Sequence, residues 1–79
     1  MNNIDKYNDI FVSVFGVDKG KLDGLFNFKD VEAWDSMTHL TLISELEEVF
    51  GIMLETDDIL HFGGYENGKN ILRKHGINI

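Results

Sequence analysis

Apolar residues recur at helical spacing in segments that end at glycine, and this pattern constrains the fold of the chain most. The first segment covers about residues 3–15 and stops before Gly16, and the clearest covers residues 36–50 and stops before Gly51. Spacings of three and four place apolar side chains on one face of an α-helix. A glycine after the last turn readily takes the left-handed conformation that ends a helix. The pattern therefore predicts helices rather than strands.

Two further helices are expected in the last third of the chain. A short third helix would have Thr56 as its N-cap and end by Gly63 and Gly64, and a fourth would run from about residue 65 to His75. The 79 residues include no proline, so no proline interrupts the predicted helices. We expect an all-α fold, a small four-helix bundle with three longer helices and a short third one, in a single domain over residues 1–79.

Residues 16–35 form a long connection between the first two helices. Its apolar side chains are too many for a free linker, and they are Leu22, Leu25, Phe26, Phe28, Val31 and Trp34. A connection of this length in a small domain is usually packed or functional. We therefore expect a packed loop, with at most one helical turn, that Trp34 anchors to the core.

The pair Asp35-Ser36 stands where the second helix begins. The Asp35 carboxylate can accept the free N–H groups of the first turn, which makes it the expected N-cap. Ser36 then takes the first helical position, exposed and beside the positive end of the helix dipole, where a bound anion is stabilised. His39 follows one turn later, but a Ser–His nucleophile would also need an orienting acid and an oxyanion site. Ser36 is thus predicted to be an attachment point rather than a catalytic nucleophile.

The net charge of −7 is concentrated after Ser36. Residues 35–60 carry seven acids and no Lys or Arg, whereas the charges in the rest of the chain cancel. Such a field repels nucleic acids and attracts basic protein surfaces. A solvated acidic face that only maintains solubility is the other interpretation of the same pattern.

Several classes of site are disfavoured by composition. The chain has no cysteine, which excludes disulfides and thiolate metal sites, and its three histidines lack paired ligand spacing. No apolar run approaches the roughly 20 residues that span a bilayer, and the first residues do not resemble a signal peptide. We expect a cytoplasmic monomer with no bound metal, no nucleic-acid partner and no stable membrane insertion.

One longer pattern is more specific than any of these features. The motif Asp35-Ser36-Met37 is followed by the run Leu46-Glu47-Glu48-Val49-Phe50-Gly51-Ile52, within the order helix, long loop, acidic helix, short helix, last helix. Over nearly its whole length the chain resembles the stand-alone acyl carrier proteins, the phosphopantetheine-binding carriers.

This resemblance implies a function for Ser36. The serine would carry 4′-phosphopantetheine, installed from coenzyme A by a phosphopantetheinyl transferase, with Asp35 as the helix cap beside it. The terminal thiol of the cofactor would hold an acyl or aminoacyl group as a thioester. The protein would not itself be an enzyme. It would present the cargo to acyl-loading and acyl-processing enzymes that have basic docking faces.

Docking of those partners is assigned to Met37, Glu47, Glu48, Ile52 and Met53. The other interpretation of Met37 and Met53 is that they fill the core, since methionine packs well into irregular gaps. The family usually has leucine after the serine, and the fatty-acid carriers often have acids where this chain has Thr38 and Thr41. The pathway is therefore either bacterial fatty-acid-like biosynthesis or a specialised one. An unmodified acidic helical adaptor that binds a basic protein is the alternative function.

Overall fold

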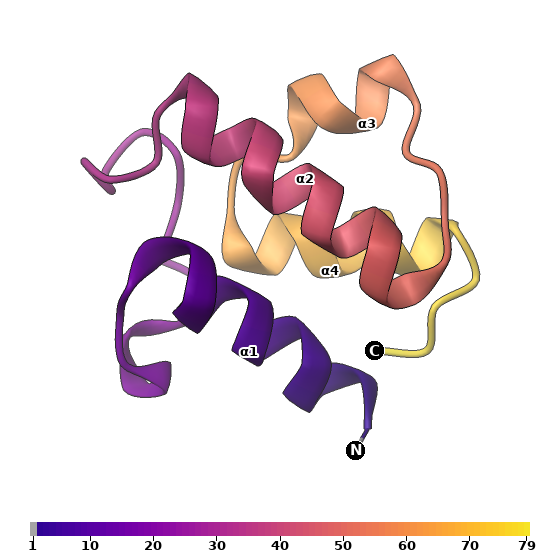
Figure 1. Ribbon diagram of the computed structural model, residues 1–79, viewed down its shortest axis with the longest axis horizontal. Coiled ribbons are helices and arrows are strands. Elements are labelled where there is room, and N and C mark those ends of the chain that lie inside the picture. The colour runs from indigo at the N-terminus through magenta and orange to yellow at the C-terminus, as the bar shows by residue number, and fades with distance from the viewer. Residues whose placement is uncertain (1) are drawn as a thin grey trace.

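Four α-helices and one 3₁₀ turn make up the regular structure of the chain in the computed structural model, which describes residues 2–79. In order they are α1 (Asn3–Phe15), the 3₁₀ turn η1 (Lys19–Lys21), α2 (Ser36–Phe50), α3 (Thr56–His61) and α4 (Tyr65–Lys74). In Figure 1, α2 runs between α1 on one side and α3 on the other, with α4 behind it. The predicted small helical bundle with a short third helix is confirmed.

The helix ends follow local chemistry that the sequence makes visible. Gly16 and Gly51 close α1 and α2 with φ of 65° and 64°, a backbone conformation that strains residues with a Cβ. Asp35 caps α2 as expected, because its carboxylate accepts the N–H of Thr38 at 2.9 Å. The third helix departs from the prediction by one residue. Glu55 is its N-cap and Thr56 lies inside the first turn, because the Asp58 carboxylate accepts the Glu55 N–H at 3.3 Å.

The core is an aromatic cluster to which the long loop contributes. Trp34 is 2 % exposed, and its ring lies 4.9 Å from that of Phe15 and 5.9 Å from that of Phe11, between ring centroids. Phe26, also from the loop, packs against the same two phenylalanines. The loop is therefore packed and Trp34 anchors it, as predicted, although Leu25 and Phe28 remain exposed.

Two backbone hydrogen bonds tie this loop to the connection between α3 and α4. The Phe28 N–H donates to the carbonyl of Gly63 at 2.8 Å, and the Tyr65 N–H donates to the carbonyl of Phe26 at 2.9 Å. They form an isolated antiparallel bridge between Asn27 and Gly64. As a result, the segment that leads into Ser36 is held against α3 and α4 rather than left free.

Helix α4 approaches the core closely through a glycine. A Cβ built on Gly68 would overlap the ring of Phe62 and the hydroxyl of Tyr7, both of which are fully buried. The Tyr7 hydroxyl donates to the carbonyl of Tyr65 at 2.6 Å, and burial raises the pKa of this phenol well above its usual value. The close approach thus depends on the missing side chain at position 68.

A buried acid joins α3 to the end of α4. Asp58 is 3 % exposed and forms an ion pair with Lys74, while its other oxygen lies 2.6 Å from Nε2 of His75. The Lys74 ammonium, followed by His75, lowers the pKa of the Asp58 carboxyl to about 2. The charge of Asp58 is therefore neutralised locally and adds little to the acidic surface.

No helix among residues 2–79 combines the length and the apolar character that crossing a bilayer requires.

Replacing Gly68 with alanine should destabilise the fold. In an open helix Gly→Ala stabilises by up to about 1 kcal/mol, but here the added methyl group displaces buried rings, and overpacking typically costs about 1–3 kcal/mol. Urea unfolding followed by circular dichroism measures the difference. Gly20→Ala is the matched control, because no atom lies within 4 Å of a Cβ at position 20. Equal stability of Gly68→Ala and wild type would contradict this account of the contact.

The stability of the fold should decrease between about pH 4 and pH 2. The pKa of Asp58 falls from the ordinary value of 3.8 to about 2 in the folded chain. Its stabilising contribution is consequently complete above the unfolded pKa and lost as the pH falls through the folded pKa. Thermal unfolding of wild type and Asp58→Asn across this range tests the assignment. The gap between their midpoints should narrow towards pH 2, and a gap that stays constant from pH 6 to 2 would show that the carboxylate is not responsible.

Candidate functional site

Ser36 occupies the first position of α2 and its side chain is exposed. The helix that it opens is long enough, at 15 residues, to present a full dipole to this end. Asp35 beside it is also exposed, and the hydrogen bond from the Thr38 N–H holds the pKa of the Asp35 carboxyl below its usual value. Ser36 is therefore an accessible hydroxyl at a capped helix N-terminus, as the sequence predicts.

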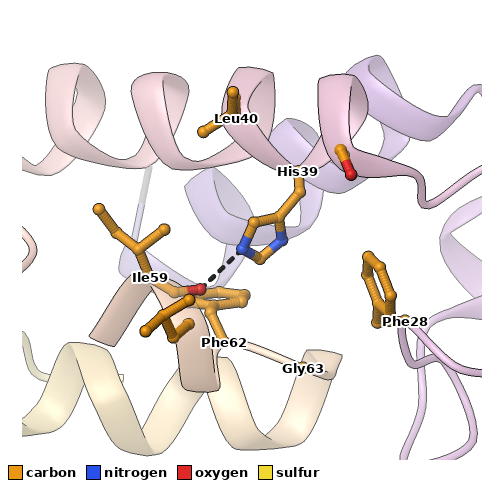
Figure 2. A pocket seen from close by; sticks show the side chains of 8 residues that line it. Phe28, His39, Leu40, Ile59, Phe62 and Gly63 are labelled. Carbon is orange, nitrogen blue, oxygen red and sulfur yellow. Dashed lines mark hydrogen bonds between the residues drawn. The ribbon is translucent and has the colours of Figure 1, made fainter. Parts of the chain in front are cut away.

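A cavity of about 410 Å³ opens beside Ser36, between α2, α3 and the loop. We call it the Ser36 cavity. Its walls are mainly apolar, and its lining residues are Phe28, Ser36, His39, Leu40, Ile59, Leu60, Phe62 and Gly63. Figure 2 shows Phe28, Ile59 and Phe62 around the ring of His39, with Leu40 on the helix above. An apolar group attached to Ser36 would find a matching surface within reach.

The ring of His39 is fully engaged at the wall of this cavity. Its Nδ1 lies 2.9 Å from the indole nitrogen of Trp34. Its Nε2 lies 2.7 Å from the carbonyl oxygen of Ile59, and Figure 2 shows this second bond. The indole N–H can only donate and the carbonyl can only accept. These two partners match the neutral tautomer that carries its proton on Nε2 and accepts the indole N–H at Nδ1. In this arrangement neither nitrogen can serve as a base for Ser36.

Two apolar side chains of α2 share the helical spacing of its buried face and are nevertheless exposed. Met37, which was assigned to docking, is 80 % exposed, and Leu40 is 60 % exposed. Only Leu42, Ile43 and Leu46 of α2 are buried. Met37 stands next to Ser36, and Leu40 lines the cavity. The apolar stripe therefore divides into a core half and a half that faces the cavity and solvent.

Met53, which was assigned to docking with core filling as the other interpretation, is 82 % exposed, while Ile52 is half-buried. Both follow the C-terminal end of α2. Position 47 lies about 16 Å along the helix axis from position 36, at 1.5 Å per residue. The proposed docking residues therefore do not converge on Ser36. Met37 adjoins it, and the others lie at the far end of the same helix.

The two glutamates assigned to docking are not equivalent. Glu47 is half-buried, and its carboxylate accepts the N–H of Leu54 at 2.9 Å, which fixes the turn after α2. Glu48 is exposed, as is Glu45 on the same helix. A role for Glu47 in holding the turn was not visible in the sequence, because the bond depends on how the chain reverses after Gly51. Glu48 is the freer group for a partner.

The remaining walls of the cavity also escaped sequence reasoning. Ile59 and Leu60 of α3, with Phe62 and Gly63 after it, meet Ser36 only through the tertiary fold. The one indication of a cavity wall in the sequence was that the long loop of residues 16–35 contains Phe28 and other apolar residues. Within residues 2–79, no three His, Cys, Asp or Glu side chains are placed to hold a metal ion together.

No protein-family model matches the chain. The assignment of a function consequently depends on the geometry around Ser36 and on the sequence motif that contains it.

Proposed function

We propose that this protein is a carrier that holds an acyl intermediate on 4′-phosphopantetheine attached to Ser36. The observation that carries the proposal is the position of Ser36, an exposed hydroxyl at a capped helix N-terminus on the rim of an apolar cavity. The motif Asp35-Ser36-Met37 within an acyl-carrier-like sequence supports it. When attached, the cofactor supplies a flexible arm ending in a thiol that forms thioesters.

The residues around Ser36 fit such a group. A phosphodiester on the serine would lie by the N-terminus of α2, where the helix dipole stabilises an anion. The Asp35 carboxylate is turned back onto the Thr38 N–H and fixes the first turn. The chain has no cysteine of its own, so the thiol that bears the cargo would come from the cofactor. These features support a role for the protein in positioning rather than in bond making.

The lining of the Ser36 cavity supports one class of cargo over another. Its walls carry no charged side chain, and both polar nitrogens of His39 are already bonded. An apolar acyl group would be accommodated there, whereas the ammonium of an aminoacyl group would find no partner. Of the cargoes that the sequence leaves open, the geometry therefore favours an apolar acyl group from a fatty-acid-like or specialised biosynthetic pathway.

Partners would recognise the exposed side of α2 and the turn after it. Met37 and Met53 are almost fully exposed, and Glu45 and Glu48 supply negative charge that is not used inside the molecule. A phosphopantetheinyl transferase and acyl-processing enzymes with basic faces suit this surface, since complementary charge speeds brief encounters. On this proposal the protein is a cytoplasmic monomer that catalyses no reaction itself.

Incubation with coenzyme A, Mg²⁺ and a broad-specificity phosphopantetheinyl transferase should raise the intact mass by one phosphopantetheinyl group. Ser36→Ala should show no increase, because it lacks the acceptor hydroxyl. Ser44→Ala is the matched control, since Ser44 is also exposed on α2 but lies two turns away. Absence of modification with several transferases would refute the carrier proposal and favour the unmodified acidic adaptor.

Charge reversal on α2 should slow the transferase at low salt. Glu45→Lys with Glu48→Lys removes the free acids, and steering effects of this kind change association by about two- to tenfold. The initial rate of modification measures the effect. The control is Asp9→Lys, because Asp9 is an exposed acid on α1. The difference should shrink at about 1 M salt, where the Debye length is near 3 Å. Equal rates at low salt would exclude these acids from docking.

A further inference from the structure

The ring of His39 connects three segments of the chain through its two nitrogens. The ring itself belongs to α2, the Trp34 indole to the loop, and the Ile59 carbonyl to α3. The two ring planes are inclined by only 29°, with their centroids 6.2 Å apart. Because Ile59 and His39 both line the Ser36 cavity, the bond between them, shown in Figure 2, forms part of its wall.

We propose that His39, in its neutral Nε2–H form, is the positioning residue that holds α3 against α2 and so sets the opening of the Ser36 cavity, and that protonation of the ring releases it. The proposal holds for the unmodified chain and does not require Ser36 to carry a cofactor.

The chemistry follows from what each partner can do. A protonated imidazole has two N–H groups and no lone pair to accept with. The indole N–H of Trp34 would then face another donor, and, since Trp34 is buried, it would have lost its acceptor in a place where a lost hydrogen bond is costly. The ring must move away from the indole. Because Nε2–H remains a donor in both forms, it is this movement that takes it from the Ile59 carbonyl.

The sign of the pH dependence is fixed by the proton count. The neutral ring that bonds to Trp34 and Ile59 carries one proton fewer than the protonated ring. A lower pH therefore favours the arrangement in which α3 is released from α2. Histidine is the side chain that ordinarily changes charge between about pH 5 and 8. The loss of the Asp58 ion pair occurs at a much lower pH, because the pKa of Asp58 is about 2.

The groups that face the ring do not supply a competing titration. Phe28 and Trp34 face it from the loop, Ile59 from α3, and Phe62 lines the same cavity, and none of these side chains titrates. The charged or titratable groups that the same elements carry elsewhere are Asp18, Lys19, Lys21, Asp23, Lys29, Asp30 and Glu32 on the loop, Asp35, Glu45, Glu47 and Glu48 on or at the start of α2, and Asp57, Asp58 and His61 on α3. Asp58 is directed to Lys74 and His75 of the last helix and its end.

Titration of the unmodified protein from pH 8 to 5 tests the proposal with two readouts. The first is ¹⁵N NMR of the His39 ring and of the Trp34 indole N–H, which is unique because the chain has one tryptophan. The second is the affinity for the neutral apolar dye N-phenyl-1-naphthylamine. We expect Nδ1 of His39 to be unprotonated at pH 8. As the ring gains its proton, the indole resonance should shift and dye affinity should fall several-fold, with the same midpoint.

Three variants separate this role from general stability. His39→Gln can offer an amide oxygen or N–H to the same partners but cannot titrate, so it should bind the dye with no pH dependence over this range. His39→Leu should bind it more weakly at every pH, because the indole and α3 lose their link. His61→Gln is the control, since His61 is exposed at the end of α3 and should keep the wild-type midpoint.

Two results would overturn the proposal. One is a pH profile of dye binding in His39→Gln that equals that of the wild type. The other is a wild-type spectrum in which the Trp34 indole resonance does not shift as the His39 ring gains its proton. This measurement needs only the wild-type protein, so it tests the proposal even if both His39 variants fail to fold. Modification of Ser36 enters neither readout, so failure here leaves the carrier proposal standing.

Discussion

A buried indole must be given a hydrogen-bond acceptor, and much of this structure follows from how the chain meets that requirement. Trp34 fills the centre of the aromatic core, where its large ring stabilises the contact between the loop and α1. Its N–H cannot reach water from there, and His39 supplies the acceptor. Since the other nitrogen of the same ring bonds to α3, satisfying one donor also places a helix. Core packing and the shape of the Ser36 cavity are thus parts of one arrangement.

The acidic character of the segment after Ser36 is less uniform than its composition suggests. Asp58 is paired with Lys74 and His75, and Glu47 holds the turn after α2. What remains for a visiting protein is a smaller set of exposed acids on α2 and at the start of α3, interrupted by exposed methionines. A partner would therefore meet mixed apolar and negative contacts along one helix, rather than a diffuse cloud of charge.

Local features could be predicted from the sequence because their chemistry is local. The ends of α1 and α2 depend on Gly16, Asp35 and Gly51, each of which acts within one turn. Periodicity also located the helices. It could not decide which half of the α2 stripe is buried, because Met37 and Leu40 have the same spacing as Ile43 and Leu46. That choice depends on where α3 and the loop lie.

Other features were missed because they join different segments of the folded chain. In the sequence, Asp58 and Glu47 resemble ordinary surface acids. Only the folded chain brings Asp58 to Lys74 and Glu47 to the N–H of Leu54. Ser36 itself could be identified from its neighbours, whereas its cavity could not, since most of the walls come from α3 and the segment after it. A site built on one helix end is visible in a sequence, and the space beside it is not.

The contact between Gly68 and Phe62 has a consequence for that space. Phe62 packs on α4 where a side chain at position 68 would have to be, and it also lines the Ser36 cavity. The volume of the Ser36 cavity is consequently set in part by a backbone position on the far side of the core. If the protein is a carrier as proposed, selection for groups of different size could act through the volume of one residue on α4, without changing Ser36 or α2.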